Sequence, residues 1–109
     1  NGAFMHCDSL TSIVIPNSLT SIESYAFCGC SSLISVVIPD SVTIIGSSAF
    51  DKCTSLNSIV IPNSVKEMGD YVFANCGLIT IYCEAESKPD GWSADWSGFA
   101  YSVEWGYKK

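Results

Sequence analysis

Residues 38–60 have the sequence IPDSVTIIGSSAFDKCTSLNSIV, and the 23 residues before them, 15–37, follow the same pattern without a gap. Thirteen of the 23 aligned positions are identical. Prolines, phenylalanines and cysteines recur at this 23-residue spacing along the chain: Pro16, Pro39 and Pro62; Phe4, Phe27, Phe50 and Phe73; Cys7, Cys30, Cys53 and Cys76. A repeat of this length is typical of solenoids, in which every unit stacks on its neighbours.

The repeat predicts where the solenoid begins and ends in the sequence. It assigns residues 1–83 to the solenoid, as a partial unit 1–14 and units 15–37, 38–60 and 61–82, and residues 84–109 to a C-terminal capping segment. The third of these units is one residue short, and aligning Leu78 with Leu33 makes Leu78 its predicted core leucine. In the central unit the predicted inward positions form a set of mostly apolar residues: Leu33, Val36, Ile38, Val42, Ile45, Ala49, Phe50 and Cys53.

Local patterns predict the shape of one coil. Residues 35–38 are rich in β-branched side chains and alternate between inward and outward positions, which favours a strand, as do residues 12–15 and 58–61. The proline after each of these segments ends the strand because it has no amide hydrogen. A second short strand is expected over 43–45, and a helical turn over 47–53.

The pattern L-x-x-I-x-I-P-x-S-[VL]-x-x-I-G-x-x-A-F-x-x-C resembles the BspA-type leucine-rich repeat. It is carried here by Leu33, Val36, Ile38, Pro39, Ser41, Val42, Ile45, Gly46, Ala49, Phe50 and Cys53. The resemblance implies an α/β-type repeat solenoid, a right-handed leucine-rich-repeat coil with a parallel β-sheet on one face. The other face would consist of short turns and of 3-10 or helical turns. An aromatic cap would cover the C-terminal end. It also implies a non-catalytic, secreted or cell-surface protein of bacteria or protists that adheres to proteins or cells.

Composition excludes several classes of protein. The 109 residues include 11 acidic residues and 5 lysines, with no arginine, for a net charge of −6. Nucleic-acid binding is therefore not expected, because it usually requires a basic patch. No apolar run approaches the roughly 20 residues of a membrane-spanning helix. The single histidine, His6, stands at a variable position, so we expect no catalytic residues and no cofactor.

The cysteines are expected to be reduced thiols rather than metal ligands. Four share one repeat position, and Cys83 falls at the position of the strand residue Ile38, so five of the six are predicted to be buried. A disulfide or a metal site stays an alternative. Cys28 shares a position with Met5, Asp51 and Ala74 and is expected to be exposed. Four acidic residues cluster in the tail: Glu84, Glu86, Asp90 and Asp95. They are expected to form a solvated loop, and a calcium site is the weaker alternative.

The two ends of the repeat differ. The tail holds six aromatic residues, which are expected to cover the end of the core, although a sugar-binding platform is an alternative: Trp92, Trp96, Phe99, Tyr101, Trp105 and Tyr107. The N-terminal end has no comparable segment. We therefore expect the natural protein to be longer and this end to be able to self-associate.

The candidate binding surface is the outward face of the predicted strands. It is a smooth, nearly uncharged strip: Ser12, Val14, Ser35, Val37, Ser58, Val60, Thr80 and Tyr82. Its flanking residues are Thr11, Ile34, Asn57 and Ile79. Low charge and an aromatic residue are typical of interface centres, so a protein or cell-surface ligand is expected here. The alternatives are an ordinary strand face and a structural spacer or array end with no ligand of its own.

Overall fold

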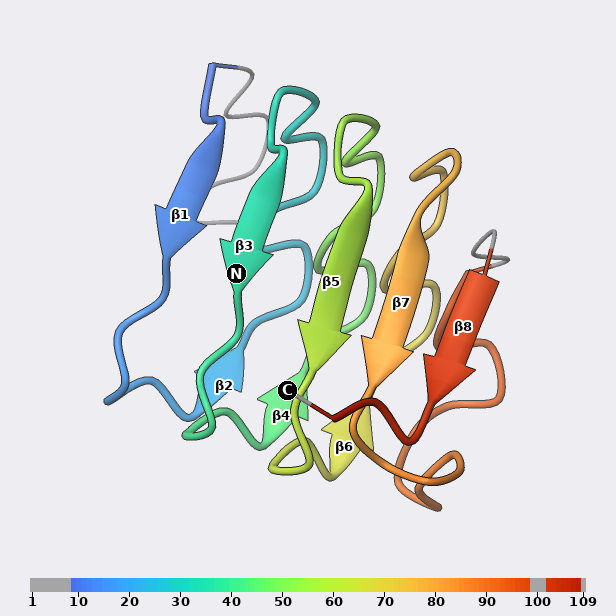
Figure 1. Cartoon of the computed structure of the whole chain (residues 1–109). Coiled ribbons are helices and arrows are strands. Elements are labelled where there is room, and N and C mark those ends of the chain that lie inside the picture. The colour runs from blue at the N-terminus through green and yellow to red at the C-terminus, as the bar shows by residue number, and fades with distance from the viewer. Residues whose placement is uncertain (1–8, 99–101, 109) are drawn as a thin grey trace.

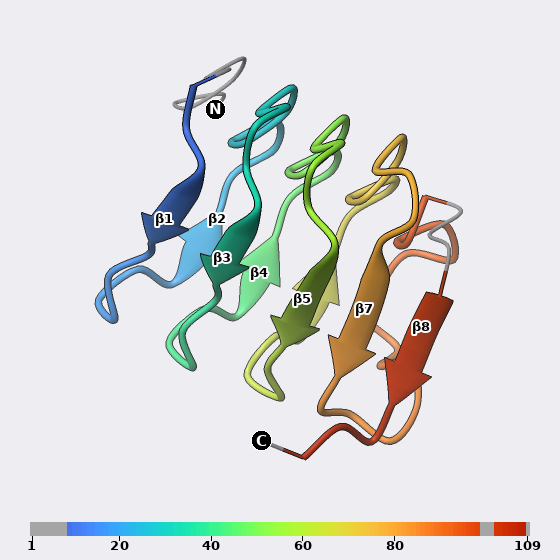
Figure 2. The same cartoon turned by 45° about the horizontal axis from the view of Figure 1, so that its top comes forward.

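The computed structural model describes residues 9–98 and 102–108, which form a parallel-strand solenoid (Figure 1). Its eight strands are β1 (Ser12–Val14), β2 (Ser21–Ile22), β3 (Ser35–Val37), β4 (Ile44–Ile45), β5 (Ser58–Ile61), β6 (Glu67–Met68), β7 (Thr80–Cys83) and β8 (Ser102–Trp105). Strands β1, β3, β5, β7 and β8 lie side by side along one face, and β2, β4 and β6 form a second row (Figures 1 and 2). The strands expected from the repeat are thus confirmed.

The 23-residue period appears directly in the strand register. Ser12 pairs with Ser35 and Ile22 pairs with Ile45, each one period further along the chain. Between β5 and β7 the offset is 22 residues, because Ser58 pairs with Thr80. All of these pairs are parallel, so equivalent side chains of successive coils stand next to one another and form ladders through the molecule.

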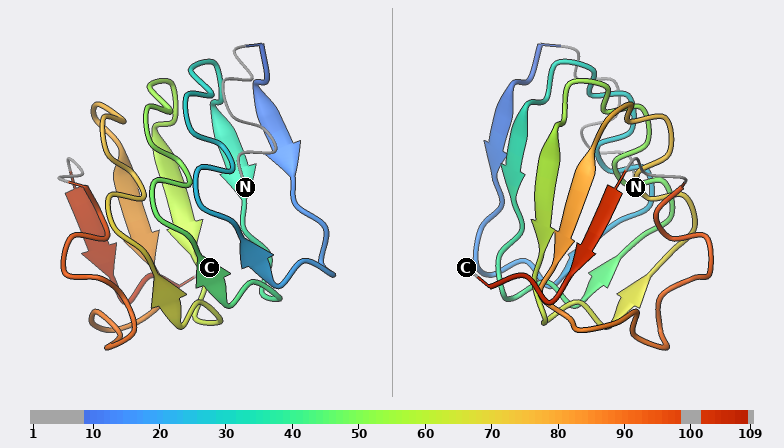
Figure 3. Two further views of the ribbon diagram at one scale, coloured as in Figure 1. Left: turned by 180° about the vertical axis from the view of Figure 1, so that it is seen from behind. Right: turned by 45° about the vertical axis from the view of Figure 1, so that its right-hand side comes forward.

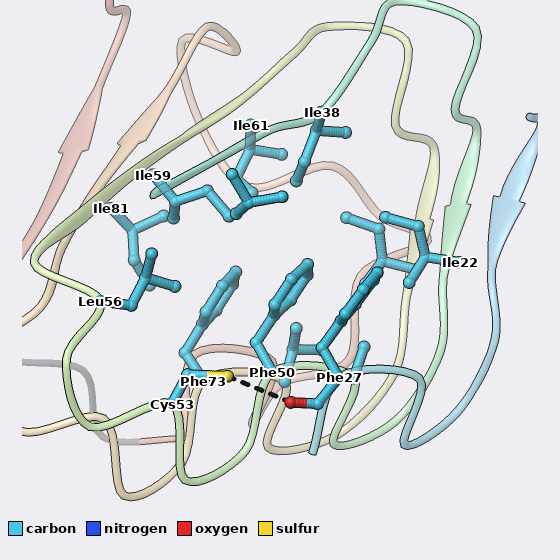
Figure 4. Packing of buried hydrophobic residues seen from close by; sticks show 14 of the residues in the cluster. Ile22, Phe27, Ile38, Phe50, Cys53, Leu56, Ile59, Ile61, Phe73 and Ile81 are labelled. Carbon is cyan, nitrogen blue, oxygen red and sulfur yellow. Dashed lines mark hydrogen bonds between the residues drawn. The ribbon is translucent and has the colours of Figure 1, made fainter. Parts of the chain in front are cut away.

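The core consists of these ladders. All eight inward positions predicted for the central unit are buried, and Figure 4 shows one of them, Phe50, between the equivalent rings of Phe27 and Phe73. The Phe27 and Phe50 rings stack with centroids 5.3 Å apart, and Phe50 and Phe73 with centroids 5.5 Å apart. Each ring thus covers the ring of the preceding coil, which buries apolar area that one coil could not bury alone.

The helical turn expected over 47–53 is wrong, and the described residues contain no helix. Ser48 and Lys52 both have positive φ, at 57° and 63°, which interrupts a right-handed helix. The amides of this segment instead bond across to the next coil: those of Ser48, Phe50 and Lys52 donate to carbonyls of Asp70, Val72 and Ala74 at 2.8–2.9 Å. The back of the solenoid is therefore a stack of turns, visible at the right of the second view in Figure 3.

The one-residue deletion lies after Ile79 rather than before Leu78, where the sequence alignment placed it. Leu78 is 74% exposed, whereas Ile79 is completely buried and takes the core position of Leu56. Cys76 and Ile79 keep the three-residue spacing of Cys53 and Leu56, so the missing residue is the one that corresponds to Asn57. The prediction of Leu78 as a core residue, and of Ile79 as a flanking surface residue, is wrong for this reason.

The tail adds a further coil and covers the end of the core. β8 pairs in parallel with β7, and Trp92 forms a bridge with Met68. The indole rings of Trp92 and Trp96 are buried, and Trp96 meets Phe73 edge-on with ring centroids 6.4 Å apart. The Trp92 indole N–H donates to the Val65 carbonyl at 3.2 Å, which satisfies its buried polar atom.

Candidate binding face on the parallel sheet

Two parallel rows of side chains run across the outer face of the sheet. The strand register aligns Ser12 with Ser35, Ser58 with Thr80, and Thr80 with Ser102, which gives a row of hydroxyl groups. The second row lies two residues further along each strand and changes character along the array: Val14, Val37, Val60, Tyr82 and Glu104. The candidate residues named from the sequence therefore share one face, as the alternation of a strand requires.

Exposure along the valine row falls toward the C-terminal end. Val14 is 87% exposed and Val37 69% exposed, whereas Val60 and Tyr82 are half-buried. Val14 and Val37 are large apolar side chains that no described residue covers, and this marks the row as a possible contact surface.

Tyr107 contributes to this face, although no pattern in the sequence predicts it there. After β8 the chain reverses at Gly106, whose φ is +71°, and the Tyr107 amide donates to the Cys83 carbonyl at 2.8 Å. The Tyr107 ring then lies beside Tyr82, with centroids 5.0 Å apart. Tyr82 is therefore one of a pair of aromatic rings at this end of the valine row.

A groove of about 360 Å³ lies on this face along β3 and β5. Val37, Val60 and Pro62 supply apolar side chains, Ser35 and Ser58 supply hydroxyl groups, and Tyr107 forms a wall. None of the described residues that line the groove carries a charge. The groove can accommodate an uncharged, mainly apolar group.

The strand pairing is interrupted beneath the groove. β1 pairs with β3, β5 pairs with β7, and β7 pairs with β8, but β3 and β5 are not paired although they are neighbours. The amide of Ile34 donates to the Thr11 carbonyl at 2.8 Å, and that of Thr80 donates to the Asn57 carbonyl at 2.9 Å. The equivalent bond from the Asn57 amide to the Ile34 carbonyl is not formed between these two described residues.

The ladder cysteines lie in the core, apart from Cys7, which is outside the described residues. Cys30, Cys53, Cys76 and Cys83 are buried thiols without disulfide bonds, as predicted. The Cys53 thiol donates to the Phe27 carbonyl at 3.2 Å, shown in Figure 4, and the Cys76 thiol to the Phe50 carbonyl at 3.0 Å. Burial raises the pKa of Cys76 to about 11 and that of Cys83 to about 12, so both stay protonated and unreactive near neutral pH.

Cys28 is only 8% exposed, so the prediction of an exposed thiol is wrong. The next coil stacks directly on this turn, where the Gly29 amide donates to the Asp51 carbonyl at 2.8 Å. Desolvation raises the pKa of the Cys28 thiol, the Asp51 carboxylate raises it further, and Lys52 opposes the rise. These effects disfavour the reactive thiolate.

Other candidate groups do not converge. Among the described residues, no three histidine, cysteine or carboxylate side chains come together in a way that could hold a metal ion. Of the four tail acids, Glu84 accepts a hydrogen bond from the Asn63 amide at 3.0 Å. His6 lies outside the described residues. In the part of the chain that the structure describes, no helix is long and apolar enough to cross a membrane.

These features define a repeat protein whose parallel sheet is open to solvent on its outer face. The family model for the BspA-type leucine-rich repeat region, in six copies, matches residues 1–88. The chain therefore belongs to the BspA-type leucine-rich repeat family.

Solved structures of leucine-rich repeat proteins are similar to the chain. One, a leucine-rich cell surface protein from Faecalibacterium prausnitzii A2-165, is 41% identical with a TM-score of 0.73, over 82% of this chain and 24% of that protein. The T. pallidum leucine-rich repeat protein is 32% identical with a TM-score of 0.72, over 95% of this chain and 43% of that protein. A leucine-rich repeat protein from Bacteroides ovatus ATCC 8483 shares the fold. It is 24% identical with a TM-score of 0.59, over 96% of this chain and 33% of that protein. This chain thus spans less than half the length of each of these proteins. No curated protein is significantly similar in a search with this chain.

Proposed function

We propose that the chain is a non-catalytic binding module of a secreted or cell-surface bacterial protein, with an adhesin-like role in contacts with proteins or cell surfaces. The observation that carries this proposal is the exposed valine row on the outer face of the parallel sheet, with Val14 at 87% and Val37 at 69% exposure. The 41% identity to a leucine-rich cell surface protein supports the location.

The partner is proposed to dock on this face rather than on the turns. Interface centres are depleted in charge and favour aromatic anchors, and the strand face offers valines followed by Tyr82. At the turns, by contrast, Asp51 is followed one coil later by Ala74, and Lys52 by Asn75, so no continuous stripe of one character forms. A surface of about four coils binds weakly alone, and avidity from further repeats or copies would raise the apparent affinity.

A pair of double variants tests this proposal. The chain is immobilised at high density and binding to a layer of host epithelial cells is measured. Val37→Lys with Val60→Lys is expected to abolish binding, because it places two charges at the centre of the face. The matched control, Asp51→Ala with Lys52→Ala, changes the turns and is expected to bind like wild type. Circular dichroism confirms that both variants fold. Loss of binding in the turn variant alone, or binding unchanged in both variants, would refute the proposed face, and a wild-type chain that does not bind would favour a spacer.

A further inference from the structure

The interrupted pairing between β3 and β5 leaves two backbone polar groups without a partner on the neighbouring strand, in residues that directly precede those lining the groove. The Asn57 amide lies directly before Ser58 of the groove lining, and the Ile34 carbonyl directly before Ser35. Both residues are exposed at the surface. A ligand that offers both donors and acceptors beside apolar groups would match this arrangement.

We infer that the groove holds one apolar side chain of an extended, uncharged peptide segment of a protein partner, and that Tyr107 is a specificity-determining wall of this site. The inference rests on the proposed function and names the partner chemistry of the same face. An extended peptide carries an amide and a carbonyl beside every side chain, which fits the unpaired backbone groups. The groove lining contains apolar side chains and hydroxyl groups, with no charged group among the described residues that would select an ion.

The geometry of Tyr107 explains why it selects the ligand. Its ring contacts Tyr82 on one side, and it lines the groove together with Val60 and Pro62. Gly106 sets the reversal that brings it there, and the Tyr107 amide is tied to Cys83. The wall is thus held by the backbone of the last strand, and the size of the side chain it admits depends on the tyrosine ring.

The absence of charge gives the site a distinctive salt dependence. The chain as a whole carries a net charge of −6, and a partner recognised through that charge would bind more weakly as salt is added. A peptide recognised through this groove would instead keep its affinity between low and high salt. The salt series therefore distinguishes docking in the groove from general attraction of a basic partner.

The first measurement is amide exchange by NMR on the whole chain. The Ile34 amide, which bonds to the Thr11 carbonyl, is expected to be protected, and the Asn57 amide, at the equivalent position one coil later, is expected to exchange rapidly. The Thr80 amide, which bonds to the Asn57 carbonyl, is a second protected reference. Equal protection of all three amides would show that β3 and β5 are paired, and would overturn the inference.

The second measurement is a titration of the labelled chain with the peptide acetyl-Ser-Val-Ser-Tyr-Ser-amide. Saturable shift changes are expected at Val37, Val60 and Tyr107, independent of salt, and acetyl-Ser-Lys-Ser-Glu-Ser-amide is expected to cause none. Tyr107→Ala should weaken binding by about tenfold, as loss of an anchoring wall does, while Tyr107→Phe retains it. Asp51→Ala with Lys52→Ala, in the turns and outside the groove, is the control and should bind like wild type.

Several results would overturn the inference while leaving the proposed function intact. They are the absence of saturable shifts at several millimolar peptide, shifts that map to the turns, binding that weakens with salt, and a Tyr107→Ala variant with unchanged affinity. In each case the cell-layer assay with the Val37 and Val60 variant still tests the proposed face independently, because it uses neither the peptide nor Tyr107.

Discussion

Replacing Cys53 with alanine tests whether the cysteine ladder is a packing element of the core. The side chain is completely buried, and its thiol donates to the Phe27 carbonyl. The change removes one sulfur atom, worth about 0.8 kcal/mol if it is treated like a buried methylene group. A residual cavity of about 25 Å³ would add about 0.6 kcal/mol at 24 cal/mol per Å³. With the weak hydrogen bond included, the unfolding free energy should fall by about 1–2 kcal/mol.

The assay is urea denaturation followed by the fluorescence of the tryptophans. Val14→Ala serves as the control, because Val14 is 87% exposed and its truncation should leave the unfolding free energy almost unchanged. Cys53→Asp should prevent folding, since it buries a charge without a partner. A Cys53→Ala variant as stable as wild type, or a folded Cys53→Asp variant, would refute the packing role of the ladder.

Three further outcomes follow from the same core. Titration of the denatured, unreduced protein should find at least five reactive thiols, and two or fewer would contradict a ladder without disulfides. Because the pKa of Cys76 is raised from 9.0 to about 11, the folded state holds the thiol proton more tightly than the unfolded chain. Its contribution to stability is complete well below pH 9 and is lost as the pH rises toward 11, by about 2 kcal/mol at pH 10.5. The difference in unfolding free energy between wild type and Cys76→Ala, measured by denaturation at about pH 7.5 and at about pH 10.5, should therefore change by about this amount between the two pH values. Truncation after Glu84 removes the buried Trp92 and Trp96 and exposes Phe73, so the melting temperature or the solubility should drop sharply. A truncated chain as stable as wild type would show that the tail does not stabilise the solenoid, and would favour the alternative of a sugar-binding platform.

The ladders were predictable because the 23-residue period and the β-branched segments both reflect stacking. A side chain that recurs at one position, such as Phe27, Phe50 and Phe73, must meet its equivalents in neighbouring coils. The turns were less predictable, since Ala49, Phe50 and Cys53 are spaced alike in a helical turn and in a stacked turn. Only the hydrogen bonds to the next coil and the positive φ of Ser48 distinguish the stacked turn from a helical turn. The residue types in this segment indicate neither of these features.

The remaining errors arose where one residue decides between two alignments or two faces. Leu78 and Ile79 are both apolar, so the pattern could not show on which side of them the deletion lies. Cys28 aligns with the charged residue Asp51, which suggested exposure, yet its small side chain is covered when the next coil stacks on the turn. The reversal at Gly106 places Tyr107 on the candidate face, and this depends on a backbone angle that the sequence pattern does not specify.

Photo-crosslinking tests most directly the claim that partners dock on the strand face. p-Benzoylphenylalanine is introduced at position 37, on the exposed valine row, or at position 52, in the exposed turn. Each protein is bound to the epithelial cell layer and irradiated, and the products covalently linked to the chain are separated by size and quantified. The account predicts a discrete crosslinked product from position 37 and none above background from position 52. Crosslinking from position 52 alone would contradict it.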